Sequence, residues 1–397
     1  MSSRRALAFL LALVLAAVAL RITTEGTPPL RIRTTLARFI RVPGRSPSLA
    51  WPAEGEAAVA VAGLGILGSS GSQTPAPIAS VAKVMTAYLT LLRAPLARGQ
   101  NGFRMRVTAA EVAEERQRAA LGESILPVSP GETITERQAL EALLIPSANN
   151  VAVMLASRAG GIQAFLALMN VTARRLGMRS TRYTDPSGFD DSTVSTAADQ
   201  LRLASVAMSE PALAEIVDER TVELPIAGEV SNYDGLVGTD GYVGVKTGSD
   251  RAAGGCLMFA RRVTIAGRRL TILGVVLGQR DGSLVPVALH SAERLGDSAG
   301  AALRLDTLLA AGTQVLSASS PDAQQTTAVT SGALTVVAWG GLTLGVNVIS
   351  RHAIDSVRAG EQLAKVFVGA THIATVDAIA QHSVGAPTLG WRLRHIL

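Results

Sequence analysis

The chain has 397 residues, of which 48% are hydrophobic, and 37 basic against 31 acidic residues give a formal net charge of +6. That length accommodates two or three domains, each large enough to bury a core. With 17% charged and 4% aromatic residues, the composition argues against a disordered chain and against one that wraps nucleic acid. One cysteine excludes a disulfide framework, and the five histidines all follow residue 289, which disfavours a zinc site or a Ser-His-Asp triad in the first two-thirds.

Residues 1–20 are expected to be an export signal or an N-terminal membrane anchor. A basic start at residues 2–5 precedes fifteen uncharged residues, 6–20, and this order is typical of secretory signals. Fifteen helical residues at ~1.5 Å each are shorter than a ~30 Å hydrocarbon core, which disfavours a permanent anchor. The Pro-, Arg- and Thr-rich residues 21–56 are interpreted as a spacer whose arginines suit anionic lipid. We therefore expect the protein to work outside the cytoplasm.

The first predicted strand, 57–62, runs into a literal G-x-G-x-x-G at residues 63–68. A dinucleotide site would need a helix to start there and an acidic residue about twenty positions later. Residues 69–77 instead contain prolines, glycine and serines, which break helices. We predict a glycine turn between two edge-like strands.

The middle of the chain is predicted to be helical. Residues 81–92 are apolar almost all round, which indicates a buried helix. Thr135 and Gln138 form a capping box that starts a helix, and Pro146 ends it. Further helices are predicted at 150–158, 162–176 and 197–208, and apolar strands at 256–260 and 270–277. This order predicts an α/β (α+β) fold, in which a sheet built from N- and C-terminal segments packs against a helical lobe.

The end of the chain is predicted to be β-rich. Residues 311–326 are small and polar and are interpreted as a linker. Residues 332–349 carry no charge, but their glycine pair and β-branched residues favour two strands and a turn over a membrane span. With a strand at 363–368, residues 327–397 form a small β-rich domain. The end around Trp391 is interpreted as a final strand, with a membrane-interface segment as the alternative.

Only three of the 37 basic residues are lysines, and Lys83 lies beside candidate chemistry. It follows Ser80 by three residues at the start of the buried helix, so both side chains share one face. A serine hydroxyl needs a base to take its proton. A lysine can be that base if burial, the positive helix end and a second cation lower its pKa. Alone, the pair is more typical of a helix-capping serine with a surface lysine.

Two further motifs carry polar groups suited to a peptide. Ser147-Ala148-Asn149 follows the proline break, where a hydroxyl can relay a proton and an amide can hold a peptide carbonyl. Lys246-Thr247-Gly248 precedes an apolar strand and is expected on an edge strand, where it suits a carboxylate and an extended backbone. Each alone is ordinarily a helix cap or a hairpin lysine.

Together, S-x-x-K, S-x-N and K-T-G are far more specific than any one of them. Ser147 follows Ser80 by 67 residues, and Lys246 follows Asn149 by 97. The set resembles the serine penicillin-binding proteins and β-lactamases, and most closely the low-molecular-mass D-alanyl-D-alanine carboxypeptidases of bacterial cell walls, peptidase family S11. The flanking residues 77–80, 146–150, 185–189 and 245–248 agree. The resemblance covers roughly 57–305 and implies a serine-peptidase catalytic domain at 57–310.

The resemblance implies a role for each motif residue. Ser80 would attack the carbonyl of the penultimate D-alanine and form an acyl-enzyme, with Lys83 as general base. Ser147 would pass the proton to the leaving D-alanine. Substrate binding would fall to a second group: Asn149 for the substrate amide, Lys246, Thr247 and Gly248 for the terminal carboxylate and its strand, Ser249 with Ser80 for the oxyanion through backbone N–H groups, and Arg280 near the carboxylate.

The implied partners are peptidoglycan stem peptides ending in D-Ala-D-Ala, β-lactam antibiotics and the outer surface of the cell membrane. No cofactor, metal or nucleic acid is expected. A class A β-lactamase would add Glu-x-x-Leu-Asn, and the nearest run, Glu229-Val230-Ser231-Asn232, lacks the leucine. A non-catalytic sensor would be expected to lose a motif residue, and none is lost, whereas an endopeptidase would use the same residues. Residues 185–191 are interpreted as a plain acidic turn and Cys256 as a core residue.

Overall fold

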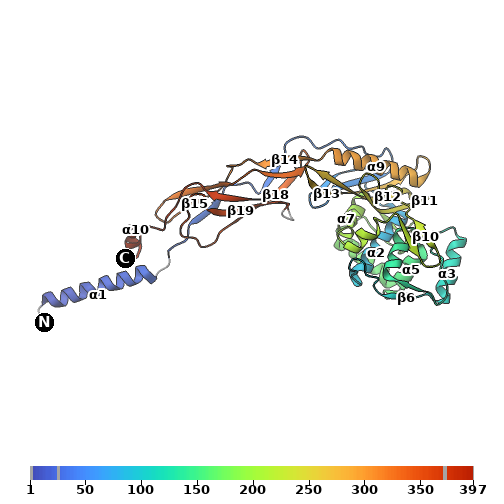
Figure 1. Ribbon diagram of the computed structural model, residues 1–397, viewed down its shortest axis with the longest axis horizontal. Helices are drawn as coiled ribbons and strands as arrows, with labels where there is room; N and C mark the ends of the chain where they lie inside the picture. Colours follow the sequence, from blue (N-terminus) through green and yellow to red (C-terminus); the bar gives the residue numbers. More distant parts are fainter. Residues whose placement is uncertain (1–2, 25–26, 370–372, 397) are drawn as a thin grey trace. The chain divides into compact units, whose positions relative to one another are not determined.

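The computed structural model describes residues 3–24, 27–369 and 373–396 (Figure 1). The chain divides into two compact units. Pro47–Arg304 form one unit, here called the catalytic unit, and Met1–Ser46 with Leu305–Leu397 form the other, here called the β unit. The first two residues of the predicted export segment lie outside the described residues.

A five-stranded antiparallel sheet forms the centre of the catalytic unit. Its order is β11-β12-β13-β3-β4, with the bounds β3 Glu56–Val61, β4 Gly65–Ser70, β11 Tyr242–Asp250, β12 Gly254–Ile265 and β13 Arg268–Gln279. β3 pairs with β13, so strands from the two ends of the unit lie side by side, as predicted. The glycine turn joins β3 and β4, but only β4 is an edge strand.

Helices cover this sheet, with α9 on one side and α7 with the rest of the helical lobe on the other (Figure 1). Their bounds are α2 Lys83–Arg93, α3 Ala109–Ala120, α4 Glu136–Leu144, α5 Asn149–Arg158, α6 Ile162–Arg175, α7 Ala197–Ala207, α8 Pro211–Ile216 and α9 Leu284–Ala301. Short strand pairs join the lobe: β5 Ala76–Pro77 with β8 Val194–Ser195, β6 Arg104–Arg106 with β7 Thr133–Thr135, and β9 Thr221–Leu224 with β10 Gly228–Ser231. The predicted helices are confirmed, whereas α3, α8 and α9 were not predicted.

Local sequence accounts for the helix that begins with Lys83 and for the helix that precedes the S-x-N motif. In α2, residues 83–91 are all buried, which matches the apolar pattern. In α4, the Thr135 side chain accepts from the Gln138 N–H and the Gln138 side chain accepts from the Thr135 N–H. Such a capping box typically stabilises a helix by about 1 kcal/mol. The helix ends at Leu144, two residues before Pro146, so the chain turns into the S-x-N motif.

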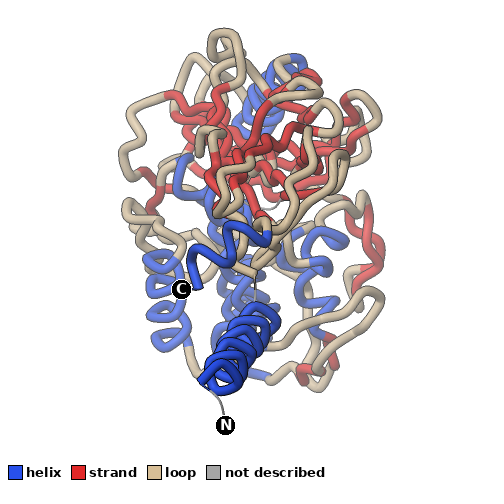
Figure 2. The backbone as a smooth tube through the Cα atoms, turned by 90° about the vertical axis from the view of Figure 1, so that its left-hand side faces the viewer, coloured by secondary structure: helices blue, strands red, loops and turns tan. Residues whose placement is uncertain are grey.

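The β unit is built on a seven-stranded sheet of order β1-β15-β16-β20-β19-β18-β2. Figure 2 shows the strands of the protein in red. The strands of this sheet are β1 Arg31–Thr34, β2 Phe39–Arg41, β15 Gln314–Ser319, β16 Gln325–Thr330, β18 Thr343–Ser350, β19 Gln362–Val368 and β20 Ala374–Ala380. β14, Arg304–Leu309, pairs with β17, Leu334–Ala338. The two strands predicted within 332–349 and the strand at 363–368 are confirmed.

Two sequence-based interpretations of this unit are wrong. The predicted spacer 21–56 supplies β1 and β2, which form the two edges of the sheet, and Val42 beside them is fully buried. The predicted linker 311–326 contains β15 and the start of β16. Both segments looked unstructured because short, half-exposed strands are held by backbone hydrogen bonds, which need few apolar side chains.

The two ends of the β unit are helical. α1, Ser3–Thr24, contacts α10, Leu389–Ile396, so the predicted final strand is wrong. Of the described residues, α1 contains a shorter apolar stretch, Leu7–Val18, and no single helix has both the length and the hydropathy to cross a membrane.

Candidate active site

Ser80 and Lys83 face each other at the start of α2. Ser80 lies in a 3-10 helix, η1 (Ala79–Ala82), and Lys83 is the first residue of α2. Lys83 Nζ lies 2.7 Å from Ser80 Oγ and donates to the Ser187 carbonyl at 3.0 Å. Burial, and secondarily Lys246, hold the pKa of Lys83 well below its ordinary value, against opposing effects of nearby carboxylates. An amine that loses its proton in contact with a hydroxyl is what a general base requires.

Close contact with Gly188 holds the turn that carries Ser80. Ala79, next to Ser80, has φ +44°, a backbone conformation that residues with a Cβ rarely adopt. Its carbonyl oxygen packs against Gly188, where a Cβ would lie only 1.9 Å from that oxygen. Gly188 itself has φ +80°. Only glycine at 188 therefore allows the loop to approach the strained turn before Ser80.

The loop that carries Gly188 is organised by Asp185. Its carboxylate accepts from the N–H groups of Ser187, Gly188 and Phe189 and from the Thr193 hydroxyl, at 2.9–3.2 Å. This fixes the Ser187 carbonyl, which accepts from Lys83 Nζ. The interpretation of 185–191 as a plain acidic turn is therefore incomplete, since the loop positions the Lys83 side chain through the Ser187 carbonyl.

The S-x-N motif presents two unsatisfied polar atoms. Ser147 is 3% exposed and has φ +67°, in the sharp connection between α4 and α5. Within the described part of the chain, neither its Oγ nor Asn149 Oδ1 has a hydrogen-bond partner, although both are buried. Buried polar atoms ordinarily have partners, so these two are available to a ligand or water.

The K-T-G motif lies on β11, an edge strand of the sheet as predicted. Lys246 is 1% exposed, and burial lowers its pKa to about 7 while the charge of Asp234 opposes this. A Cβ at Gly248 would lie 3.0 Å from the Ser80 nitrogen and 3.1 Å from the Ile78 oxygen. The absence of a side chain at 248 therefore lets β11 lie directly against η1.

These elements enclose a cavity of about 280 Å³. It is lined by Ser80, Ser124, Ser147, Tyr233, Thr247, Gly248, Ser249 and Val285. Five predicted residues line it, while Lys83, Asn149 and Lys246 are buried next to lining residues. Arg280 is not in the lining, because its exposed guanidinium donates to the carbonyls of Arg251 and Ala252. Within the described residues, no cluster of His, Cys, Asp or Glu could hold a metal ion.

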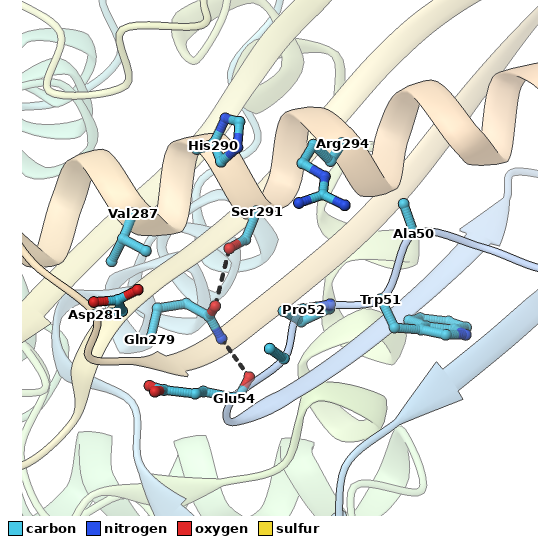
Figure 3. Close-up of a pocket in the computed structure, with 11 residues that line it drawn as sticks. Ala50, Trp51, Pro52, Glu54, Gln279, Asp281, Val287, His290, Ser291 and Arg294 are labelled. Carbon is cyan, nitrogen blue, oxygen red and sulfur yellow. Dashed lines mark hydrogen bonds between the residues drawn. The ribbon is translucent and has the colours of Figure 1, made fainter.

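A second hollow of about 290 Å³ lies between α9 and the segment before β3 (Figure 3). Its buried polar side chain, Gln279, is fully paired: it donates to the Glu54 carbonyl at 2.7 Å and accepts from Ser291 Oγ at 2.9 Å. No predicted site residue lines it. Unpaired polar atoms and the Ser–Lys contact therefore single out the first cavity.

Sequence reasoning missed several residues of the site. Ser124, Tyr233 and Val285 line the cavity, and none belongs to a recognisable motif. Glu123 and Asp234 are buried carboxylates near the motif residues. No local signal could have found them, because their positions depend on packing between distant segments. Cys256 is buried, as predicted, and burial raises the pKa of its thiol to about 12.

Comparison with known proteins identifies the family. The model of the D-alanyl-D-alanine carboxypeptidase family, peptidase S11, matches residues 53–281. The D-alanyl-D-alanine carboxypeptidase DacB2 of Mycobacterium tuberculosis is 39% identical over 152 residues, covering 36% of this chain and 52% of that protein. The D-alanyl-D-alanine endopeptidase of Pseudomonas aeruginosa is 31% identical over 208 residues, covering 50% and 63%. The chain thus spans between about half and two-thirds of the length of these relatives.

Solved structures agree with this assignment and confirm the predicted fold class. The Streptomyces K15 DD-transpeptidase aligns with a TM-score of 0.55 and 25% identity over 65% of this chain and 100% of that chain. The carboxypeptidase DacD of Francisella tularensis shares the fold, with a TM-score of 0.57 and 19% identity over 86% of this chain and 95% of that one. The family match spans more than half of the chain and includes all three motifs. The chain belongs to the D-alanyl-D-alanine carboxypeptidase family, peptidase S11.

Proposed function

We propose that the protein is a serine-type D-alanyl-D-alanine carboxypeptidase that removes the terminal D-alanine from peptidoglycan stem peptides. The observation that carries this proposal is the 2.7 Å contact of Lys83 Nζ with Ser80 Oγ, beside a cavity that Ser147 and the K-T-G strand also line. Membership of the S11 family supports it.

In the first half-reaction, neutral Lys83 takes the proton of the Ser80 hydroxyl. Oγ attacks the carbonyl carbon of the penultimate D-alanine, and the backbone N–H groups of Ser80 and Ser249 stabilise the oxyanion by about 3–4 kcal/mol each. Ser147, whose Oγ has no protein partner within the described residues, relays a proton to the leaving amine as the peptide C–N bond breaks. A water molecule then attacks the Ser80 ester and gives a proton to Lys83, and Lys83 returns a proton to Ser80 Oγ as the ester bond breaks and the shortened peptide leaves.

The terminal carboxylate of the substrate is proposed to bind at the start of the K-T-G strand. Lys246 Nζ and Thr247 Oγ1 lie 3.5 Å apart, so an ammonium and a hydroxyl can bind the same carboxylate. Arg280 would act on it at longer range, because its guanidinium is held at the turn after β11. Asn149 would hold the substrate amide.

Of two alternative activities, only the first differs from this one in what the cavity must contain. A β-lactamase of class A needs a glutamate to activate the deacylating water, and the described residues that line the cavity include no carboxylate. Glu229, the sequence candidate, is exposed on β10. Endopeptidase activity is the second candidate, because relatives named D-alanyl-D-alanine endopeptidase are 31% identical to this chain.

The test is covalent labelling with a fluorescent penicillin, with Ser80→Ala as control. We expect labelling of the wild type and none of the variant; equal labelling of both would refute the role of Ser80. D-alanine release from a pentapeptide is then compared with cephalosporin hydrolysis and with cleavage of a cross-linked dimer. Faster cleavage of the dimer would favour the endopeptidase, and faster cephalosporin turnover the β-lactamase.

We also propose that the protein is exported and works at the outer face of the cell membrane, where its substrate lies. Residues 1–20 would act as signal or anchor, as their sequence pattern indicates. Labelling of intact cells with a penicillin that cannot cross the membrane would detect it there. Labelling only after lysis would contradict this location.

A further inference from the structure

Glu123 is a buried carboxylate beside the site that the proposed mechanism does not use. Its side chain is 2% exposed. Oε2 accepts from Asn149 Nδ2 and from Arg118 Nη1, each at 2.7 Å. Arg118 is in turn paired with Glu114, four residues earlier on α3. A continuous set of charge-assisted hydrogen bonds therefore runs from Glu114 on α3 to the S-x-N motif.

The contact with Glu123 restricts how the Asn149 amide can lie. A carboxylate can only accept hydrogen bonds, so the NH₂ end of the amide faces Glu123 and the flipped orientation is disfavoured. Oδ1 is left buried and without a partner among the described residues. The next residue, Ser124, accepts from the Asn149 backbone N–H at 2.8 Å and lines the cavity. Residues 123–124 thus fix both the backbone and the side chain of Asn149.

Glu123 also contributes to the charge around Lys83. Four charged groups act on that amine: Lys246 from β11, Asp185 from the loop before β8, and Glu123 with Arg118 from the α3 side. The carboxylate of Glu123 raises the pKa of Lys83, whereas the Arg118 guanidinium lowers it. Two residues in direct contact therefore act on the general base with opposite signs.

We propose that Glu123 is a positioning residue for acyl transfer, which holds the Asn149 amide in one orientation and, with Arg118, balances the charge beside Lys83. The inference rests on the proposed function, because it assigns Asn149 and Lys83 the roles given above. It adds a carboxylate that contacts Asn149 rather than Ser80, and it links Arg118 and Glu114 of α3 to the S-x-N motif.

The test measures the second-order rate of acylation by fluorescent penicillin as a function of pH. In Glu123→Gln, a neutral amide oxygen replaces the charged Oε2 that accepts from both Asn149 and Arg118, so both hydrogen bonds lose their charge assistance and acylation should fall about tenfold to a hundredfold. The acid limb of the profile should also move to lower pH, because loss of the negative charge lowers the pKa of Lys83. Arg118→Gln should move the same limb to higher pH. A merely structural role would not produce opposite shifts.

Two variants separate the hydrogen bond from the charge. Glu123→Asp keeps the charge but is one methylene shorter, so the rate should fall while the acid limb stays in place. Glu123→Gln combined with Asn149→Asp exchanges the amide and the carboxylate, so the hydrogen bond between the two positions is restored with donor and acceptor reversed. The acylation rate of this double variant should be about tenfold higher than that of Glu123→Gln alone. The matched control is Glu115→Gln, the same charge change on α3 at a residue outside the network, which should leave rate and profile unchanged.

If Glu123→Gln is acylated at the wild-type rate and its acid limb lies at the wild-type pH, the proposal is overturned. Normal acylation with slowed deacylation would also overturn it, because that result would make Glu123 a base for the hydrolytic water. A wild type that is acylated but releases no D-alanine contradicts only the proposed function. If the wild type is not acylated at all, a double-mutant cycle of thermal unfolding on Glu123 and Asn149 still tests the pair, and absence of coupling would refute it.

Discussion

The two buried lysines of the site differ in their surroundings, although both are buried next to residues that line the same cavity. Lys83 begins a helix, and its neighbours are two cations and two carboxylates whose effects on its pKa oppose each other. Lys246 lies on an edge strand, and the charge that opposes the effect of burial on it is that of Asp234, a carboxylate that is 3% exposed. Burial lowers the pKa of both lysines.

This difference would allow two residues of the same type to serve the two roles proposed above, general base for Lys83 and carboxylate binding for Lys246. Around Lys83 burial has the largest effect on the pKa, the two cations and the two carboxylates oppose each other, and the result favours the neutral amine that a general base needs. Beside Lys246 the Asp234 carboxylate favours the ammonium that a carboxylate-binding group needs. The third lysine, Lys365, lies on β19 in the β unit, is 45% exposed and pairs with Asp377 at 3.7 Å.

The largest effect is expected from Lys83→Arg, which keeps the charge but replaces the amine. A guanidinium does not lose its proton in proteins, so acylation should fall about 10²- to 10⁴-fold. Stopped-flow acylation by fluorescent penicillin measures this. Lys365→Arg is the matched control and should leave the rate unchanged. More than a tenth of wild-type activity in Lys83→Arg would show that another group is the base.

A smaller effect is expected from Gly188→Ala, which disturbs the surroundings of Lys83 without touching Lys246. Its Cβ would lie 1.9 Å from the Ala79 oxygen, so η1 must move, and we expect acylation to fall about tenfold or more. Gly267→Ala is the control, since it has a similar φ of +77° with nothing within 4 Å of the new Cβ. It should cost only the backbone strain of about 1–2 kcal/mol.

Thermal unfolding separates these two glycine variants. Gly188→Ala should lose about 1–3 kcal/mol more stability than Gly267→Ala, because overpacking adds to the strain. Equal losses, with normal acylation by both, would mean that the loop does not hold the nucleophile's turn.

The smallest effect is expected from Asp234→Asn, a shift in pH dependence. Binding of the substrate carboxylate requires protonated Lys246, so kcat/KM should decline as pH rises through its pKa of about 7. Asp234 raises that pKa, and its neutralisation should therefore move the alkaline limb to lower pH. The acid limb, which depends on Lys83, should not move. A pH profile of D-alanine release measures both limbs, and a shift of the acid limb alone would contradict the assignment of the two lysines.

Much of the catalytic unit could be predicted from the sequence, because its signals are local. The capping box at Thr135 and the proline break at Pro146 place the S-x-N motif, and the apolar pattern after Ser80 predicts a buried helix. The β unit was less predictable. Its edge strands, β1 and β2, are short and half-exposed, and their partners lie more than 280 residues away. Nothing in a Pro- and Arg-rich segment indicates such a pairing.

The sequence by itself determined the order of the three motifs, the helices next to the first two and the family to which the chain belongs. Caps, turns and periodicity depend on residues only a few positions apart. Tertiary structure alone decided that Lys83 has a pKa low enough to favour the neutral amine and that Lys246 lies near the buried carboxylate of Asp234. It also decided that Asp185 and Glu123 orient Lys83 and Asn149. Burial and Coulomb interactions depend on distances through space, and the groups concerned come from segments that only folding brings together.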